Sequence, residues 1–240
     1  VAVFIAVHAG LALAEICTPG TLLGSLGSRW HPFFLLASCL LLLVGLIDDA
    51  FELRPWLKLA GQVVVASLMY GAGARIGTFF WADMPEVLNY ALTMAWYIGI
   101  INAFNLIDGM DGLAAGLASL SALGLAVCLA SRGQASEALP LIALCGACLG
   151  FLRSNFHPAS IFLGDCGSMF LGLLLATVPL FTGAKSAFLA SVGVPLLVMG
   201  VPLFDTVLAI WRRSLRAALP TLMDNGGRAV HVMQADKEHL

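Results

Sequence analysis

Polar residues interrupt an apolar stretch near the middle of the chain, in the segment NAFNLIDGMDGLAAG. They are Asn102, Asn105, Asp108 and Asp111. No residue from 87 to 107 carries a formal charge, and a second apolar stretch follows the segment. A spacing of three residues would direct Asn105, Asp108 and Asp111 to one side of a helical end. Charged groups at the edge of a membrane are costly and usually functional, so this pattern predicts a polar site at the end of a membrane helix.

Further carboxylates stand at the ends of other apolar runs. They are Asp48, Asp49, Asp165 and Asp205. An even number of expected membrane crossings separates each group from the next, which places all of them on one side of the membrane. Carboxylates gathered at one depth repel each other unless a cation lies among them, and their hard oxygen atoms favour Mg²⁺ or Mn²⁺. Basic side chains on or after the same spans could bind phosphate oxygens, so the set predicts phosphoryl transfer. These are Lys58, Arg212 and Lys237.

The elements that must position these residues are membrane helices. The 240 residues are 60% hydrophobic and 11% charged, whereas soluble domains carry about 25% charged residues. We therefore expect an all-α, polytopic transmembrane helix bundle of about eight spans. The expected spans are 1–15, 32–47, 57–73, 87–107, 112–130, 138–154, 167–182 and 186–204. A transmembrane domain over 1–210 would be followed by an interfacial helix and a polar arm over 211–240. No basic run indicates a nucleic acid partner.

The basic residues predict which compartment the carboxylates face. On the carboxylate side are Arg54, Lys58, Arg153, Arg212, Arg213, Arg216, Arg228 and Lys237, and on the other side are Arg29, Arg75, Arg132 and Lys185. Because cytoplasmic loops carry the excess of Lys and Arg, the carboxylate face is expected to be cytoplasmic.

Three segments resemble the cytoplasmic motifs of the polyprenyl-phosphate N-acetylhexosamine-1-phosphate transferases. They are GLIDDAFEL with Lys58 and Gln62, NAFNLIDGMDGLAAG, and FLRSNFHPASIFLGDCGS. The resemblance implies an enzyme of the bacterial cytoplasmic membrane, surrounded by membrane lipids and compatible with a homodimer. It would transfer GlcNAc-1-phosphate from a UDP-sugar to undecaprenyl phosphate and release UMP, the first membrane step of lipid-linked envelope glycan synthesis. The second segment is more similar to the branch that uses UDP-GlcNAc than to the UDP-MurNAc-pentapeptide branch, which stays the alternative.

Carried over by position, the resemblance also implies roles for individual residues. The catalytic residues would be Asp48 and Asp49, near the lipid phosphate, with Asp108 and Asp111. The substrate-binding residues would be Lys58, Asn105, Asn155, Asp236, Lys237 and His239. Asp165 would be the principal Mg²⁺ ligand, and Mn²⁺ could take the place of Mg²⁺.

The sequence departs from the family pattern at three places. The family's first span has no counterpart here, the third acidic position is Glu52 rather than Asp, and ADKEHL stops before two expected histidines. We therefore expect a fragment of a longer enzyme. Two other classes of membrane protein match the sequence less well. A CDP-alcohol phosphotransferase would carry an Arg soon after Asp-Gly, which DGMDGLAAG lacks. An ion-coupled transporter would place its charges near the middle of the bilayer rather than at the ends of spans.

Overall fold

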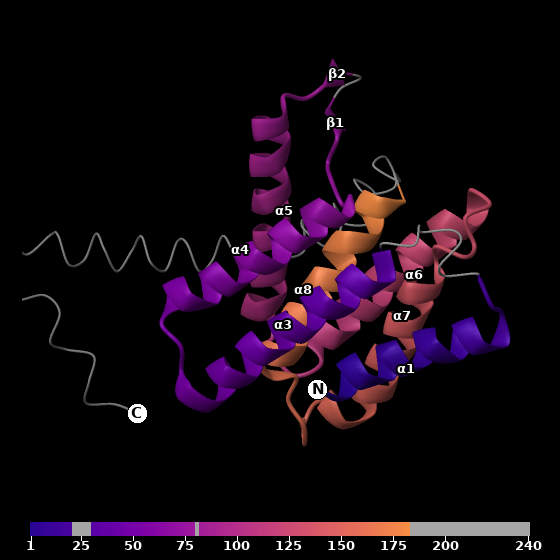
Figure 1. Ribbon diagram of the computed structural model, residues 1–240. Coiled ribbons are helices and arrows are strands. Elements are labelled where there is room, and N and C mark those ends of the chain that lie inside the picture. The colour runs from indigo at the N-terminus through magenta and orange to yellow at the C-terminus, as the bar shows by residue number, and fades with distance from the viewer. Residues whose placement is uncertain (21–29, 80–81, 183–240) are drawn as a thin grey trace, which may run out of the picture. The chain divides into compact units, whose positions relative to one another are not determined.

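The computed structural model describes residues 1–20, 30–79 and 82–182 (Figure 1). The chain divides into two units, Val1–Leu197 and Val198–Leu240, and all described residues belong to the first. Several predictions therefore lie outside the described residues. They are the span at 186–204, the domain boundary between 210 and 211, Asp205, and the arm residues Asp236, Lys237 and His239.

The described residues form seven α-helices and one short hairpin, which confirms the all-α class. The helices are α1 (Ala2–Cys17), α3 (Trp30–Phe51), α4 (Pro55–Ala72), α5 (Glu86–Ile107), α6 (Leu113–Ser131), α7 (Leu139–Asn155) and α8 (Gly164–Phe181). Strands β1 (Thr78–Phe79) and β2 (Ala82–Asp83) pair antiparallel, with Thr78 opposite Asp83, in the connection between α4 and α5.

The predicted number of eight spans is wrong for the part of the chain that is described. Seven helices occupy the seven expected ranges, but only α3, α5, α6 and α8 are long and apolar enough there to cross a membrane. Helices α1 and α7 have 16 and 17 residues, short of the roughly 20 that a bilayer core requires. Helix α4 has 18 residues, but its polar Lys58 and Gln62 reduce its hydropathy. An apolar run of 16 or 17 residues forms a helix but is shorter than the bilayer core, so the number of apolar runs exceeds the number of full spans.

Local sequence sets both ends of α4. Pro55 occupies the first turn, where its missing N–H removes no helical hydrogen bond and its fixed φ suits a helix. At the other end Gly73 adopts φ 108°, a left-handed conformation, and its N–H bonds to the last carbonyls of the helix. The helix therefore holds Lys58 in its first turns, close to the end of α3.

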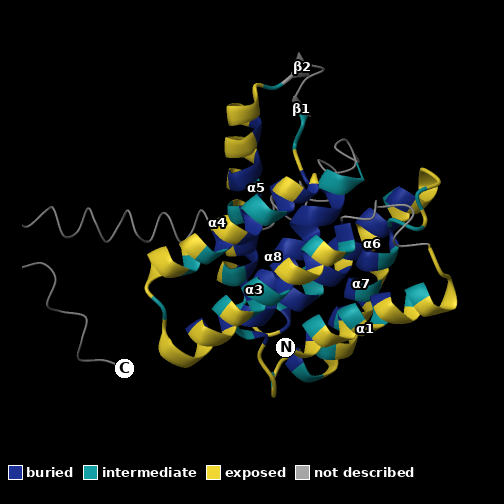
Figure 2. Ribbon diagram, viewed as in Figure 1, coloured by how far each residue is buried: buried dark blue, intermediate teal, exposed yellow. Residues whose placement is uncertain are grey.

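Helix α8 is the centre of the described unit. Its residues from Cys166 to Pro179 are all buried, and it packs mainly against α3 and α5 (Figures 1 and 2). Glycines allow this close approach: a Cβ on Gly45 would lie 2.3 Å from the Cα of Cys166, and one on Gly172 would lie 2.7 Å from the Cα of Ile101. Small residues of this kind let membrane helices pack backbone to backbone. The depth of α8 is thereby fixed against α3 and α5.

The outward faces of the helices are apolar. Large hydrophobic side chains are exposed along several of them (Figure 2), among them Leu36, Leu43, Ile47, Leu120 and Val127. Exposed apolar surface on this scale indicates contact with lipid rather than water. Together with the four spanning helices, it makes the chain part of an integral membrane protein.

Candidate functional site

The candidate site lies where the C-terminal ends of α3, α5 and α7 meet the N-terminal ends of α4, α6 and α8. Hydrogen bonds and ion pairs join each of these ends to another. The carboxylates of Asp48, Asp49, Asp108 and Asp165 lie at these ends of the helix bundle, as does that of Asp111, whereas Asp205 lies outside the described residues.

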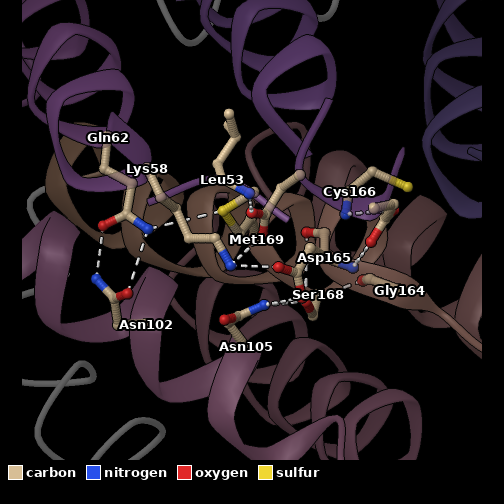
Figure 3. Close-up of polar contacts among 12 residues, drawn as sticks. Leu53, Lys58, Gln62, Asn102, Asn105, Gly164, Asp165, Cys166, Ser168 and Met169 are labelled. Atoms are coloured by element: carbon tan, nitrogen blue, oxygen red, sulfur yellow. Dashed lines mark hydrogen bonds and ion pairs between the residues drawn. The ribbon is translucent and has the colours of Figure 1, made fainter. Parts of the chain in front are cut away.

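Lys58 holds two carboxylates together. Its ammonium group forms ion pairs with Asp48, near the end of α3, and with Asp165, in the first turn of α8 (Figure 3). The Lys58 and Asp48 side chains are 18% and 8% exposed, so water screens this pair weakly, whereas Asp165 is 31% exposed. The second oxygen of Asp48 accepts a hydrogen bond from the N–H of Leu53 at 2.8 Å. One ammonium group therefore links three helices.

Asn105 holds the other oxygen of Asp165. Its Nδ2 donates to Asp165 Oδ1 at 2.7 Å and to Ser168 Oγ at 3.1 Å (Figure 3). Ser168 is fully buried, and its hydroxyl lies 3.0 Å from the carbonyl oxygen of Gly164, to which it donates. Both oxygens of Asp165 thus have partners from other helices, and the carboxylate is held in one orientation.

Asp49 caps α8 from a different helix. Its Oδ1 accepts a hydrogen bond from the N–H of Asp165 at 2.9 Å, and its Oδ2 accepts one from the N–H of Cys166 at 3.4 Å. A carboxylate is favourable at a helix N-terminus, where N–H groups lack helical partners and the helix dipole is positive. Because both oxygens bind backbone, Asp49 positions the start of α8.

Gly164 is expected to be required for this cap. It adopts φ +68°, and a Cβ there would lie 3.0 Å from Asp49 Oδ2. We expect Gly164→Ala to destabilise the protein by about 1–2 kcal/mol, the cost of a left-handed backbone for a residue with a side chain. Thermal unfolding in detergent would measure the effect. Gly146→Ala, at a helical glycine with nothing within 4 Å of the added Cβ, is the matched control and should not destabilise. Equal melting temperatures for both variants would contradict the prediction.

Among the described residues, the electrostatic influences on Asp108 come from carboxylates and not from a basic side chain. Asp108 caps the C-terminal end of α5. Burial, with the negative charges of Asp165 and Asp49, raises the pKa of its carboxyl group to about 7, although a hydrogen bond from the backbone of Gly164 acts in the opposite direction. Together these groups leave an excess of negative charge that a bound cation would relieve.

The donors present are compatible with Mg²⁺. The described residues contain no group of three or more His, Cys, Asp or Glu side chains arranged around a metal position. Mg²⁺ does not need such a group, because it usually takes one or two carboxylates and completes its octahedron with water and substrate phosphate. The side chains of Asp165 and Asp108 are partly exposed, and they are close enough for the charge of one to act on the other. The donor set therefore fits the ion.

A second group of contacts joins the loops beside the site. Asn155, 4% exposed, accepts from the N–H of Gly112 at 3.1 Å and donates to the carbonyl of Ile161 at 2.8 Å. Asp111 Oδ2 accepts from His157 Nδ1 at 2.9 Å and from the N–H of Ala159 at 3.2 Å. These two hydrogen bonds, chiefly that of His157, hold the pKa of Asp111 below its usual range. The loop before α6 is thus fastened to the loop between α7 and α8.

Asn155→Ala is expected to loosen these two loops. It leaves the buried N–H of Gly112 and the carbonyl of Ile161 without their partner, which costs about 1–3 kcal/mol of unfolding free energy. Thermal unfolding would again be the measurement. Ser160→Ala, which removes a hydroxyl donating to the carbonyl of Ser154 in the same exposed loop, is the control and should change stability little. A stability loss in the control as large as that of Asn155→Ala would contradict the specific role.

The structure separates the predicted residues into two groups. Lys58, Asn105, Asp48, Asp49, Asp108 and Asp165 lie together, whereas Asp111 and Asn155 belong to the loop contacts. Ser168 was not predicted as a site residue, and Gln62 and Asn102, which bond to each other beneath Lys58, were named in the motifs without individual roles. Their helical spacing from Asp165, Lys58 and Asn105 is the signal that could have identified them.

Comparisons with known proteins show the family of this chain. The model of glycosyl transferase family 4 matches residues 31–183. The chain is 36% identical over 219 residues to the probable undecaprenyl-phosphate N-acetylglucosaminyl 1-phosphate transferase of Bacillus subtilis, covering 89% of this chain and 59% of that protein. It is 35% identical over 266 residues to the decaprenyl-phosphate N-acetylglucosaminephosphotransferase of Mycolicibacterium smegmatis, covering 98% of this chain and 65% of that protein.

A more distant branch also matches. The chain is 34% identical over 157 residues to the phospho-N-acetylmuramoyl-pentapeptide-transferase of Moorella thermoacetica, covering 58% of this chain and 49% of that protein. The chain thus spans only part of the length of each of these relatives. Because the family model covers more than half of the 240 residues, and with them every described residue of the site, the chain belongs to glycosyl transferase family 4.

Proposed function

We propose that this protein transfers a sugar 1-phosphate, GlcNAc-1-phosphate, from UDP-GlcNAc to a polyprenyl phosphate in the membrane. The observation that carries the proposal is the bridge of Lys58 between Asp48 and Asp165, with Asn105 on the second oxygen of Asp165. It stands at the ends of membrane helices, where a lipid-anchored phosphate and a water-soluble nucleotide can both arrive. Undecaprenyl phosphate is the acceptor we propose, in line with the name of the Bacillus relative.

In the proposed reaction, an oxygen of the lipid phosphate attacks the phosphorus that bears the sugar. The bond from that phosphorus to the bridging oxygen breaks, and UMP leaves with the bridging oxygen. A monoester phosphate has a second pKa of about 6, so the acceptor is already mostly dianionic at neutral pH. The site must therefore bring anions together rather than remove a proton. A double displacement through an aspartyl phosphate is the alternative mechanism.

The residues have separate tasks in this proposal. Lys58 provides positive charge for phosphate oxygens, and Asp48 orients the Lys58 ammonium group. Asn105 fixes Asp165. Asp165 and Asp108 would hold Mg²⁺, which would supply charge neutralisation at the diphosphate when bound. Asp49 contributes by capping α8, in place of the role near the lipid phosphate that the resemblance implied.

The relatives favour GlcNAc over MurNAc-pentapeptide as the donor sugar. The two GlcNAc-1-phosphate transferases cover 89% and 98% of this chain, whereas the pentapeptide transferase covers 58%. We place the site on the cytoplasmic side of the bacterial inner membrane, because the sequence predicts that most of the basic residues lie on the carboxylate side. UDP-sugars are water-soluble and reach the site from that compartment.

Release of UMP tests the proposal. The protein in membranes would be incubated with UDP-GlcNAc, undecaprenyl phosphate and Mg²⁺, with UDP-MurNAc-pentapeptide in a parallel reaction. UMP release that requires the lipid and is faster with UDP-GlcNAc is the expected result. Faster release with the pentapeptide donor would move the protein to the other branch, and no release with either donor would reject the transferase. Release without the lipid would favour the aspartyl phosphate mechanism.

A further inference from the structure

A pair of amide side chains lies one helical turn from the Lys58 bridge. Gln62 Nε2 donates to Asn102 Oδ1 at 3.2 Å, and Asn102 Nδ2 donates back to Gln62 Oε1 at 2.6 Å (Figure 3). Gln62 has 0% exposed surface, and its Nε2 also lies 3.6 Å from the sulfur of Met169. The second hydrogen of Asn102 Nδ2 is available to the carbonyl of Ile98, 2.8 Å away. The two amides therefore satisfy each other across α4 and α5.

The pair is in helical register with the site on three helices. Gln62 follows Lys58 by four positions on α4, and Asn102 precedes Asn105 by three on α5. On α8, Met169 follows Asp165 by four positions. Residues three or four apart lie on the same face of a helix. Each member of the pair, and its sulfur neighbour, thus stands directly behind one polar group of the site.

The amide pair restricts sliding and rotation of α4 against α5 more strictly than apolar packing would. Two apolar side chains of similar volume would fill the same space but would tolerate a small slide or rotation of one helix. A reciprocal amide pair tolerates neither, because a shift of one residue, about 1.5 Å along the axis, would break both hydrogen bonds. An amide left unpaired in an apolar interior is costly, so the paired register is the favoured one.

We propose that the Gln62–Asn102 pair is a positioning device that holds α4 and α5 in register against α8, so that Lys58 and Asn105 both reach Asp165. The pair would not touch the substrate; it would act through Lys58 and Asn105. The kinetic part of this inference rests on the proposed function, whereas the positioning itself does not.

The test compares single variants with a reciprocal exchange. Asn102→Leu and Gln62→Met each remove the pair, and Asn102 is exposed enough for its variant to fold. The double variant Gln62→Asn/Asn102→Gln keeps two amides and the same combined side-chain length. We expect the single variants to lower kcat at least about 10-fold with little change in KM, because a displacement near 1 Å can cost about 100-fold. The double variant should recover most of the kcat that the single variants lose.

A second readout does not depend on turnover. Lys58 is 18% exposed and bound by two carboxylates, so it should react slowly with acetic anhydride. Mass spectrometry should show several-fold faster acetylation of Lys58 in the single variants and normal acetylation in the exchange. Asn89→Leu is the control: Asn89 is also a buried amide of α5, bonded to the N–H of Gly77 at 3.0 Å, at the opposite end of the helix. It should lower the melting temperature and leave kcat and Lys58 acetylation unchanged.

The outcomes separate the two proposals. If Asn102→Leu leaves both kcat and acetylation unchanged, or if the exchange behaves like the single variants, the positioning role is overturned. If Asn89→Leu produces the same changes, the effect is general destabilisation and the role is also overturned. A third outcome is that the unaltered protein transfers no sugar phosphate while Lys58 is still acetylated faster in the single variants and at the normal rate in the exchange. In that case the transferase proposal fails and the positioning role stands.

Discussion

Asp165→Asn is expected to lower kcat for sugar-phosphate transfer by about 10³-fold while the protein stays folded. The substitution keeps the shape of the side chain, and its oxygen can still accept from Asn105. It removes the negative charge that pairs with Lys58 and that would hold Mg²⁺. Loss of one electrostatic group at a transition state typically costs about 10²–10³-fold, and here one change affects both a cation and an ammonium group.

The measurement for Asp165→Asn is UMP release, accompanied by binding of Mn²⁺ followed by electron paramagnetic resonance. We expect weaker Mn²⁺ binding in the variant, a readout that needs no turnover. Glu86→Gln is the control, because it makes the same acid-to-amide change in an ion pair with Arg75 that is exposed and lies at the start of α5. Exposed pairs contribute little, so the control should keep its activity. More than a tenth of the normal kcat in Asp165→Asn would remove Asp165 from the proposed metal site.

Lys58→Met is expected to reduce both stability and activity. It leaves Asp48, only 8% exposed, without its ion-pair partner. Removal of one partner from a buried ion pair costs about 3–5 kcal/mol, and we expect the lower end because Asp165 is 31% exposed and can be solvated. Activity should fall by about 10³-fold, since the site loses its positive charge toward phosphate.

A double variant distinguishes the two effects of Lys58→Met. Adding Asp48→Asn removes the unpaired buried charge, so the double variant should recover much of the lost melting temperature. It should recover none of the UMP release, because no ammonium group has been restored. A double variant no more stable than Lys58→Met alone would show that the charge on Asp48 is not what destabilises the single variant.

The positions of the helices could be predicted from the sequence, because apolar runs and the residues that end them are local features. The gathering of carboxylates could also be predicted, since successive apolar runs joined by short connections alternate in direction, whether or not each run is long enough to cross the bilayer. Seven of the expected ranges contain helices, and Asp48, Asp49, Asp108 and Asp165 do meet. The number of full spans could not be derived in this way, because it depends on a few residues at each end.

The contacts within the site could not be predicted, and the reason is physical. A helix that is apolar on nearly all sides has no polar face from which its rotation can be deduced. The sequence therefore could not show that Gln62 turns toward Asn102, or that Asp49 accepts hydrogen bonds from the backbone of α8. Nor could it show that Asp111 turns toward His157.

The order in which the partners leave the ribosome has a consequence for assembly. Lys58 pairs with Asp48, and Gln62 with Asn102, so α3, α4 and α5 satisfy these polar groups among themselves. Asp165 follows Asn105 by 60 residues, which corresponds to roughly 3–12 s of synthesis at about 5–20 residues per second. During that interval the side chains of these two pairs can satisfy each other within the lipid before α8 has been synthesised. Helix α8, synthesised later, then adds the contacts of Asp165 with Lys58 and Asn105.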